Sequence, residues 1–309
     1  MKRVVDRIQW YRKQWAHRRL AASVLKARPI VPADDGVIYF SMIGTRVLLP
    51  YLVSIKSLWH QVPRGRVVIL DDGTLTDADR KLLAYHLGDP EIRAIAAVDT
   101  GDCPRGGTWE RLLTILDLRA DAYVVQVDSD TVTVGPLPEV AAAIDAGRSF
   151  TLKGEAASQI LPLATIAAQA IESQRFTNPA AHVQGAIESG MDRLDLPELA
   201  SPAYVRGCSG FAGFAPSGEG RRIAEAFSRE ATALLGAERW AQWGSEQVTS
   251  NFVIANQPDP LLLPYERYIN FWNEGVPEDA RFIHFIGTHR FTGGAYADAT
   301  RRAVAMLPR

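Results

Sequence analysis

The sequence predicts an α/β fold: a single domain with a mostly parallel central sheet, preceded by an N-terminal helix. Three observations carry this expectation. Short apolar runs rich in β-branched residues alternate with segments of helical leucine spacing, acidic residues follow the points where strands should end, and a basic helical segment precedes Pro29 and Pro32. Strands that alternate with helices are typical of parallel sheets joined by right-handed crossovers.

The expected strands are short apolar runs, as buried strands of parallel sheets usually are. They cover residues 37–43, 67–70, 92–98 and 123–127. Leucines at helical spacing predict helices over residues 48–60 and 109–118. Thr76, with Asp79 three positions later, has the form of a capping box at the start of another helix. Further along the chain we expect an apolar helix over residues 160–171 and a loop over residues 175–179.

Composition limits the class of protein. The chain has 309 residues, of which 47% are hydrophobic and 22% charged, and its net charge of −1 gives no reason to expect nucleic acid as a partner. No apolar run reaches the roughly 18 residues of a transmembrane helix, and the basic first segment lacks the apolar core of a secretory signal. Cys103 and Cys208 are too few for a disulfide framework or a CxxC zinc site. We therefore expect a cytoplasmic protein.

Residues 1–28 differ from the rest of the chain. They hold nine Lys or Arg residues and one Asp, a net charge of +8, and we place a domain boundary after them, with a basic amphipathic helix over residues 1–30 and the α/β domain over residues 31–309. A narrow apolar seam is formed by Val4, Ile8, Tyr11, Trp15, Ala22 and Leu25. Two hypotheses stay open: the helix packs on its own domain or on a second subunit, or it contacts a membrane surface, peripherally at the inner membrane face.

Acidic residues gather where strands end. Asp71, Asp72, Asp128 and Asp130 should share the sheet edge beyond the strand carboxyl ends, where α/β proteins bind ligands. On an extended chain, Asp128 and Asp130 would point to one side with Ser129 opposite. Two close carboxylates suit Mg²⁺ or Mn²⁺, which often share their ligands with a substrate diphosphate. The alternative is an acidic turn whose carboxylates cap backbone N–H groups. The chain has no GxGxxG and no GxxxxGK[ST], which disfavours dinucleotide and P-loop sites.

Residues 125–134, VQVDSDTVTV, resemble the DxD segment of GT-A-fold glycosyltransferases, especially family eight, and the resemblance runs over about residues 36–291. Residues 282–290, FIHFIGTHR, resemble the His-Phe-x-Gly-x-x-Lys-Pro-Trp motif of that family. The resemblance implies that His284 is a metal ligand together with Asp128 and Asp130. It also implies that Arg290 takes the place of the lysine that meets the donor diphosphate. Phe291 and Thr292 stand where the family has Pro-Trp.

Two more segments carry the resemblance. Residues 204–211, YVRGCSGF, resemble the family's Phe-Asn-Ser-Gly-Val strand, which would place Ser209 and Gly210 near the sugar; a β-bulge is the alternative. Residues 245–251, SEQVTSN, resemble Asp-Gln-Asp-x-x-Asn, which would make Glu246 and Gln247 the catalytic pair, although Val248 replaces the second Asp. Ser245 also reads as a helix N-cap. The remaining donor-binding residues that the resemblance implies are Ser41, Thr45, Asp71, Asp72, Arg111, Ser129 and Gly287.

The function implied is that of a metal-dependent glycosyltransferase with a nucleotide-sugar donor. The resemblance favours a UDP-hexose and retention of the anomeric configuration, although an acid at residue 246 leaves inversion open. The acceptor is a glycan, lipid or protein that the sequence does not specify. Three alternatives remain: a non-catalytic nucleotide-sugar-binding relative, a nucleotidyltransferase and a metal-dependent hydrolase.

Overall fold

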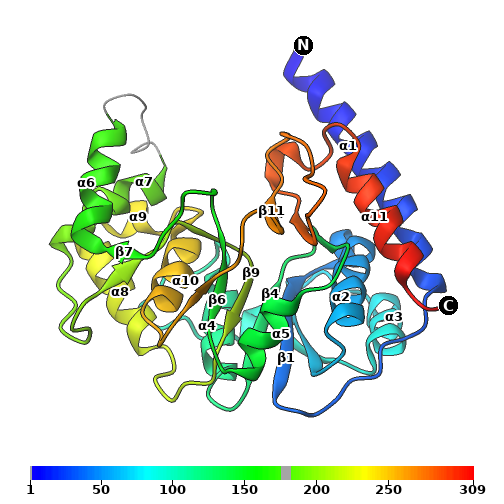
Figure 1. Cartoon of the computed structure of the whole chain (residues 1–309), viewed down its shortest axis with the longest axis horizontal. Helices are drawn as coiled ribbons and strands as arrows, with labels where there is room; N and C mark the ends of the chain where they lie inside the picture. The colour runs from blue at the N-terminus through cyan, green and yellow to red at the C-terminus, as the bar shows by residue number, and fades with distance from the viewer. Residues whose placement is uncertain (1, 175–181) are drawn as a thin grey trace. The chain divides into compact units, whose positions relative to one another are not determined.

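The computed structural model describes residues 2–174 and 182–309 (Figure 1). The loop expected over residues 175–179 lies outside this part of the chain, as do the side chains of Val4 and Ile8. Within the described residues, no helix combines the length and the apolar character needed to cross a membrane.

A seven-stranded, mostly parallel sheet confirms the predicted α/β class. Its strand order is β10-β6-β9-β4-β1-β2-β3. Strands β1, β2 and β3 pair in parallel, as do β10 and β6, whereas β6 and β9 are antiparallel. The strands span Val37–Ile43 (β1), Arg66–Asp71 (β2), Glu91–Ala94 (β3), Tyr123–Val127 (β4), Phe150–Lys153 (β6), Gly207–Phe214 (β9) and Leu261–Leu262 (β10).

The chain forms two compact units and passes between them more than once. Unit 1 contains Met1–Ala96, Val125–Ala141 and Pro264–Arg309, and unit 2 contains Ala97–Val124 and Ala142–Leu263. The N-terminal helix is part of unit 1, and the boundary proposed near residue 30 stays a prediction.

In unit 1, helix α2 contacts β1 of the large sheet, and a second sheet has the order β11-β12-β5. The apolar run of β1 is almost completely buried, as its sequence predicts. Helix α2 packs on β5, and both α1 and α11 pack on α2. The remaining elements of this unit are α1 (Lys2–Ala21), α2 (Leu48–Gln61), α3 (Asp77–Leu87), β5 (Thr131–Thr133), α5 (Pro138–Asp145, which starts in unit 1), β11 (Tyr268–Asn270), β12 (Phe282–His284) and α11 (Ala295–Met306).

The start of α3 confirms the predicted capping box. The Thr76 hydroxyl accepts from the backbone N–H of Asp79, and the Asp79 carboxylate accepts from the backbone N–H of Thr76. The expected strand over residues 92–98 is too long, because β3 ends at Ala94 and a 3₁₀ turn follows over Ile95–Ala97. All four residues of β3 are at least partly exposed, so burial of side chains does not stabilise a longer strand here.

Unit 2 packs helices against β6 and β9. Phe227 of α8 stacks on Phe252 of α10, and Trp240 packs edge-on against Phe227 and Trp109. Helix α4 covers the predicted residues, and the expected helix over residues 160–171 begins slightly later. The helices and short strands of this unit are α4 (Trp109–Leu118), β7 (Leu161–Pro162), α6 (Leu163–Gln174), α7 (Val183–Glu188), β8 (Ala203–Tyr204), α8 (Arg222–Leu235), α9 (Ala237–Trp240) and α10 (Ser245–Ala255).

The expected N-cap role of Ser245 is wrong. The cap of α10 is Gly244, which has a φ of 105° and offers no side chain, and Ser245 is the first helical residue. The Ser245 hydroxyl instead accepts a hydrogen bond of 2.8 Å from the indole Nε1 of Trp109. This bond ties the start of α10 to α4.

The N-terminal helix is confirmed but is shorter than expected, because α1 ends at Ala21 and a 3₁₀ turn follows over Ala22–Lys26. The described part of the predicted apolar seam is largely exposed. Tyr11, Trp15 and Leu25 of that seam are 44%, 60% and 37% exposed. The side that packs carries His17 and Ala21, which are buried. His17 donates or accepts a 2.9 Å hydrogen bond with Thr300 of α11 and stacks on Tyr296 of the same helix. The side of α1 that is buried is therefore the side that contacts α11.

Candidate metal centre

The predicted acidic pair lies at the carboxyl ends of the strands in unit 1. Ile43 at the end of β1 is in register with Asp71 at the end of β2. The Ser41 hydroxyl of β1 donates to the carbonyl of Val127, the last residue of β4, at 2.7 Å. The segment of residues 128–130 follows directly and leads into β5. The expectation that Asp71 and Asp128 follow strand ends at one edge is therefore correct.

Residues 128–130 form a turn rather than the extended chain that we expected. The Thr131 backbone N–H and hydroxyl donate to the Asp128 carbonyl at 3.3 and 3.0 Å, and the Ser54 hydroxyl of α2 donates to the same carbonyl at 3.0 Å. These three donors close the turn, and the turn brings the Asp128 and Asp130 carboxylates together.

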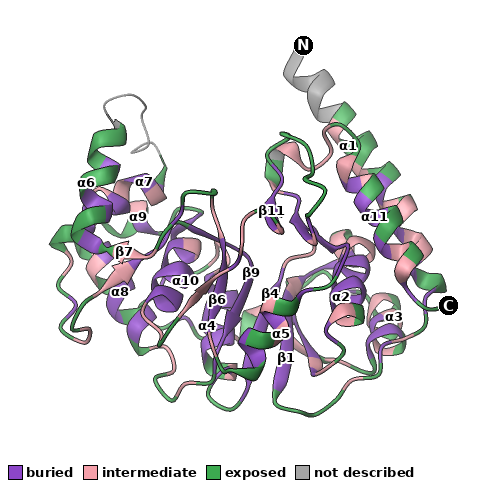
Figure 2. Cartoon of the chain, in the orientation of Figure 1, coloured by how far each residue is buried: buried purple, intermediate pink, exposed green. Residues whose placement is uncertain are grey.

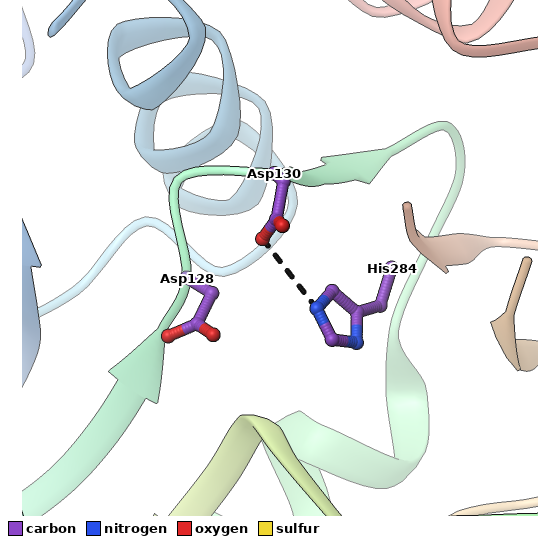
Figure 3. A group of neighbouring side chains, drawn as sticks. All are labelled: Asp128, Asp130 and His284. Carbon is purple, nitrogen blue, oxygen red and sulfur yellow. Dashed lines mark ion pairs between the residues drawn. The ribbon is translucent and has the colours of Figure 1, made fainter. Parts of the chain in front are cut away.

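The second sheet delivers the histidine. Strand β12 runs antiparallel to β5 with His284 opposite Thr131, and the Phe285 backbone N–H donates to the Asp130 carbonyl at 2.9 Å. One ligand atom from each of Asp128, Asp130 and His284 lies within 4.8 Å of the other two. Figure 3 shows the three side chains around a common point, with the imidazole turned toward Asp130. The predicted grouping of these three residues is thus present in the structure.

Asn270 orients the histidine. It lies on β11 in register with His284, and its Oδ1 is 3.0 Å from the Nδ1 of His284. An amide oxygen accepts, so Nδ1 carries the proton and Nε2 is the atom directed at Asp130, 3.4 Å from Oδ1. The sequence alone does not reveal this role of Asn270, because the pairing of β11 with β12 is not visible along the chain.

Arg290 also contacts Asp130. Its guanidinium pairs with Oδ2 of Asp130, and its Nε donates to the Phe285 carbonyl at 3.0 Å. Burial alone would raise the pKa of Asp130, but His284 and Arg290 outweigh it and hold this pKa at about 2. Asp130 is therefore ionised at every physiological pH. The predicted role of Arg290 toward a diphosphate stays a prediction.

Stacked aromatic rings lie beside the segment that carries Asp128 and Asp130, and the sequence gives no sign of them. Tyr296 of α11 stacks on Phe285, at 4.4 Å between ring centroids, and its hydroxyl donates to the Ser129 carbonyl at 3.4 Å. His17 of α1 stacks on the same tyrosine at 3.7 Å. The contact of Tyr296 with His17 depends on how α1 and α11 are aligned along each other, and the sequence carries no signal for that alignment.

These residues fit a divalent cation. Two carboxylates and an imidazole are accepted ligands for Mn²⁺ and, through oxygen, for Mg²⁺. A ligating histidine usually donates its other ring N–H to an oxygen, and here that oxygen belongs to Asn270. The Nε2 atom of His284 lies 3.4 Å from Oδ1 of Asp130, and a divalent cation can take the place of a proton between these two atoms.

The other residues of unit 1 expected to bind a donor lie around strand ends and turns. Ser41 is buried, and Thr45 donates to Asp79 at 2.6 Å. Asp71 accepts from the backbone N–H groups of Gly73 and Leu75 at 2.8 and 3.2 Å and pairs with Arg80. Asp72 accepts from Thr74, and Gly287 opens a 3₁₀ turn over Gly287–His289. The carboxylates of Asp71 and Asp72 thus accept hydrogen bonds from backbone or hydroxyl groups of the turn that follows β2.

Unit 2 holds a separate polar cluster around Glu246. The guanidinium of Arg111 lies 3.0 Å from Oε2 of Glu246 and 3.2 Å from the Ser209 hydroxyl, and the Thr108 hydroxyl donates to the same Glu246 oxygen at 2.9 Å. The side-chain oxygen of Gln247 accepts from the Ser209 backbone N–H at 3.4 Å. Arg111 and Glu246 are 8% and 2% exposed, so this is a buried ion pair.

The Glu246 cluster brings together four of the residues that the resemblance singled out, and Gly210 lies beside them on β9. Thr108 was not expected there. It has a φ of 76°, a left-handed conformation that threonine rarely adopts, and it occupies the N-cap position of α4 without a side-chain capping hydrogen bond. Backbone strain at a polar cluster is a common feature of functional sites.

No family model and no curated protein matches this chain. Solved structures do. The apo structure of WbbM, a bifunctional glycosyltransferase, is 16% identical over 91% of this chain and 51% of its own, with a TM-score of 0.55. The chain thus spans about half the length of WbbM. The apo structure of mouse xyloside xylosyltransferase 1 is 8% identical (82% and 97% covered, TM-score 0.47). The galactosyltransferase LgtC in complex with donor and acceptor sugar analogues is 10% identical (88% and 96% covered, TM-score 0.49).

The likeness to WbbM establishes the fold. At such low identity it shows the arrangement of helices and strands and nothing finer, but that arrangement is the GT-A glycosyltransferase fold that the sequence motifs predicted. The resemblance to family eight in particular stays a prediction.

Proposed function

We propose that this chain is a metal-dependent glycosyltransferase that moves a sugar from a nucleotide-diphosphate sugar to an acceptor. The observation that carries the proposal is the convergence of Asp128, Asp130 and His284 at the carboxyl edge of the sheet, on a fold shared with a glycosyltransferase. In α/β proteins this edge is where ligands bind. The three ligands would hold Mn²⁺ or Mg²⁺.

The bound cation would supply Lewis-acid stabilisation of the negative charge that develops on the departing diphosphate. The protein's own residues would do the rest. Asn270 keeps the imidazole of His284 oriented, and Arg290 adds a second positive charge beside the cation. An arginine can bridge two phosphate oxygens with paired N–H groups. The Arg290 side chain could therefore rotate from the Asp130 carboxylate to the diphosphate and bind it in the same bidentate way.

The remaining residues receive roles by the same resemblance. Glu246 and Gln247 would bind the sugar, with Arg111, Ser209 and Gly210 supporting them. Ser41, Thr45, Asp71 and Asp72 would lie near the nucleoside, and Ser129 and Gly287 near the diphosphate. Before a donor binds, Arg111 neutralises Glu246, which is consistent with an acid that holds hydroxyl groups rather than one that accepts protons freely.

The test is release of nucleoside diphosphate from a panel of nucleotide sugars, with and without Mn²⁺, by the wild type and by Asp130→Asn. We expect Mn²⁺-dependent turnover that falls by about two to three powers of ten in the variant, the usual loss when a charge-stabilising group is removed. Asp298→Asn is the matched control, since this exposed carboxylate pairs only with Arg301 within α11 among the contacts described. Equal turnover by wild type and Asp130→Asn would contradict the proposal.

The same assay separates the competing functions. Pyrophosphate release from a nucleoside triphosphate identifies a nucleotidyltransferase, and metal-dependent donor binding without turnover identifies a non-catalytic relative. Hydrolysis that no added glycan, lipid or protein fraction accelerates identifies a hydrolase. We further propose a UDP-hexose donor and retention of configuration, which NMR of the product's anomeric proton tests; an inverted product would contradict retention.

A further inference from the structure

The outward side of α1 carries a tryptophan and a tyrosine among basic residues. Trp15 is 60% exposed and Tyr11 is 44% exposed. The buried side of the helix is already occupied, because His17 and Ala21 pack toward α11 and α2. Figure 2 shows the exposed residues along the described part of α1. The ring of Trp15 therefore lies on the side of α1 that faces away from α11 and α2.

Charge on this segment has one sign. Residues 9–28 contain six basic residues and no Asp or Glu: Arg12, Lys13, Arg18, Arg19, Lys26 and Arg28. All of them except Arg18 are exposed. The chain as a whole has a net charge of −1, so the positive charge is local to this helix and its continuation. A surface of this kind attracts a polyanionic partner.

Arginine side chains lie beside both exposed aromatic rings of α1. The guanidinium of Arg19 lies over the Trp15 ring at 4.4 Å from its centroid, one helical turn away. Arg46, from the turn that precedes α2, lies 5.6 Å from the Tyr11 ring. Tryptophan and tyrosine prefer the boundary between headgroups and acyl chains, and arginine pairs with phosphate there. Exposed aromatic rings beside arginines favour a lipid surface over a folded acidic protein, which would require a matching apolar pocket.

We propose that the outer face of α1, formed by Tyr11, Arg12, Trp15 and Arg19, binds the surface of an anionic lipid bilayer. Arg12 and Arg19 supply attraction to lipid phosphates, and Trp15 inserts its ring between headgroups. Binding is peripheral and reversible, since one tryptophan and a few charges give far less than the anchoring of a spanning helix. This interaction is independent of the sugar-transfer chemistry proposed above.

The test is co-sedimentation of the full chain with vesicles of phosphatidylcholine alone or of phosphatidylcholine with phosphatidylglycerol. The variant is Trp15→Ser combined with Arg19→Glu. Its matched control is Lys81→Glu combined with Tyr85→Ser, because Lys81 and Tyr85 are also exposed one turn apart, on α3 of the same unit. Both double variants change the net charge equally and replace only exposed side chains, and their unfolding midpoints show whether each remains folded.

We expect the wild type and the α3 variant to bind the anionic vesicles and not the neutral ones. The α1 variant should bind at least about tenfold more weakly, given the contribution of each basic residue near an anionic surface. Binding should also weaken with salt, as screening shortens from about 10 Å at 0.1 M to about 3 Å at 1 M. Equal binding by both variants, or equal loss in both, overturns the proposal. A different result would also overturn it: a wild type that does not bind vesicles but forms a dimer in sedimentation velocity, while the α1 variant is a monomer. The outer face of α1 would then bind a second copy of the chain.

Discussion

The Nδ1 atom of His284 lies 3.0 Å from the Oδ1 atom of Asn270, which fixes the imidazole so that Nε2 points toward Asp130. Both side chains are buried. Neighbouring strands hold the pair, since Asn270 on β11 is in register with His284 on β12. Asn270 thus determines which ring nitrogen of His284 carries the proton and which one can bind a metal.

Replacing this partner tests its role. Asn270→Ala should weaken Mn²⁺ binding by roughly tenfold or more, because the imidazole loses the acceptor that orients it. Asn270→Asp should bind Mn²⁺ at least as tightly as the wild type, since a carboxylate accepts the same proton. Isothermal titration with Mn²⁺ measures both. Equal affinity in the alanine variant would show that Asn270 does not orient the ligand.

Arg290 should have opposite effects on two ligands. Its charge pairs with Asp130 and repels a cation, so Arg290→Gln should bind Mn²⁺ alone several times more tightly, since two like charges a few ångströms apart in a water-exposed site repel by about 1 kcal/mol. The same variant should bind a nucleoside diphosphate with Mn²⁺ about tenfold more weakly, because it loses a phosphate partner. Arg281→Gln, which changes another partly exposed arginine of unit 1, is the control. A loss of affinity for both ligands would show that Arg290 supports the metal ligands structurally.

The buried pair of Arg111 and Glu246 should be costly to break. Arg111→Met leaves an uncompensated carboxylate beside Ser209, and we expect the free energy of unfolding to fall by about 3–5 kcal/mol. Adding Glu246→Leu should recover most of that loss, because the buried charge is removed, while activity stays absent. Urea unfolding of the single and double variants measures the coupling. If the two losses simply add, the residues do not form a buried pair.

His17 should make stability depend on pH. Burial, followed by the positive charge of Arg290, lowers the pKa of His17 from 6.5 to about 4. Between these values the unfolded chain takes up a proton that the folded protein refuses, so the free energy of unfolding falls as the pH decreases from 6.5 toward 4. Above pH 6.5 this contribution is constant.

His17→Gln should reduce that slope, and His60→Gln, which changes an exposed histidine on α2, should not. Urea unfolding at several pH values across the window provides the comparison. An unchanged slope in His17→Gln would mean that other groups cause the acid sensitivity.

The sequence predicted the strand ends better than the contacts made there. Strand β1, helix α4 and strand β4 fall where apolar runs and leucine spacing placed them, and the predicted metal ligands converge. Asn270 and Tyr296 escaped prediction because their roles depend on which strands and helices become neighbours. Pairing of distant segments has no local periodicity, whereas a buried strand does.

One error has a local cause. Ser245 has the residue type of an N-cap, but Gly244 occupies that position in a left-handed conformation, and the serine hydroxyl is used by Trp109. The sequence leaves open which side of α1 packs, because a helix with apolar and mixed faces can pack through either one. His17 and its stack on Tyr296 decide the matter in the folded chain.

Direct Mn²⁺ binding is the measurement that tests the central claim most closely. Titration followed by electron paramagnetic resonance should show one bound Mn²⁺ per chain, with tighter binding when a nucleoside diphosphate is present. Asp130→Asn and His284→Ala should each remove that site, and Asp298→Asn should leave it unchanged. A wild type that binds no Mn²⁺ with any nucleoside diphosphate, or an Asp130→Asn variant that binds it equally well, would contradict the assignment of Asp128, Asp130 and His284 as a metal centre.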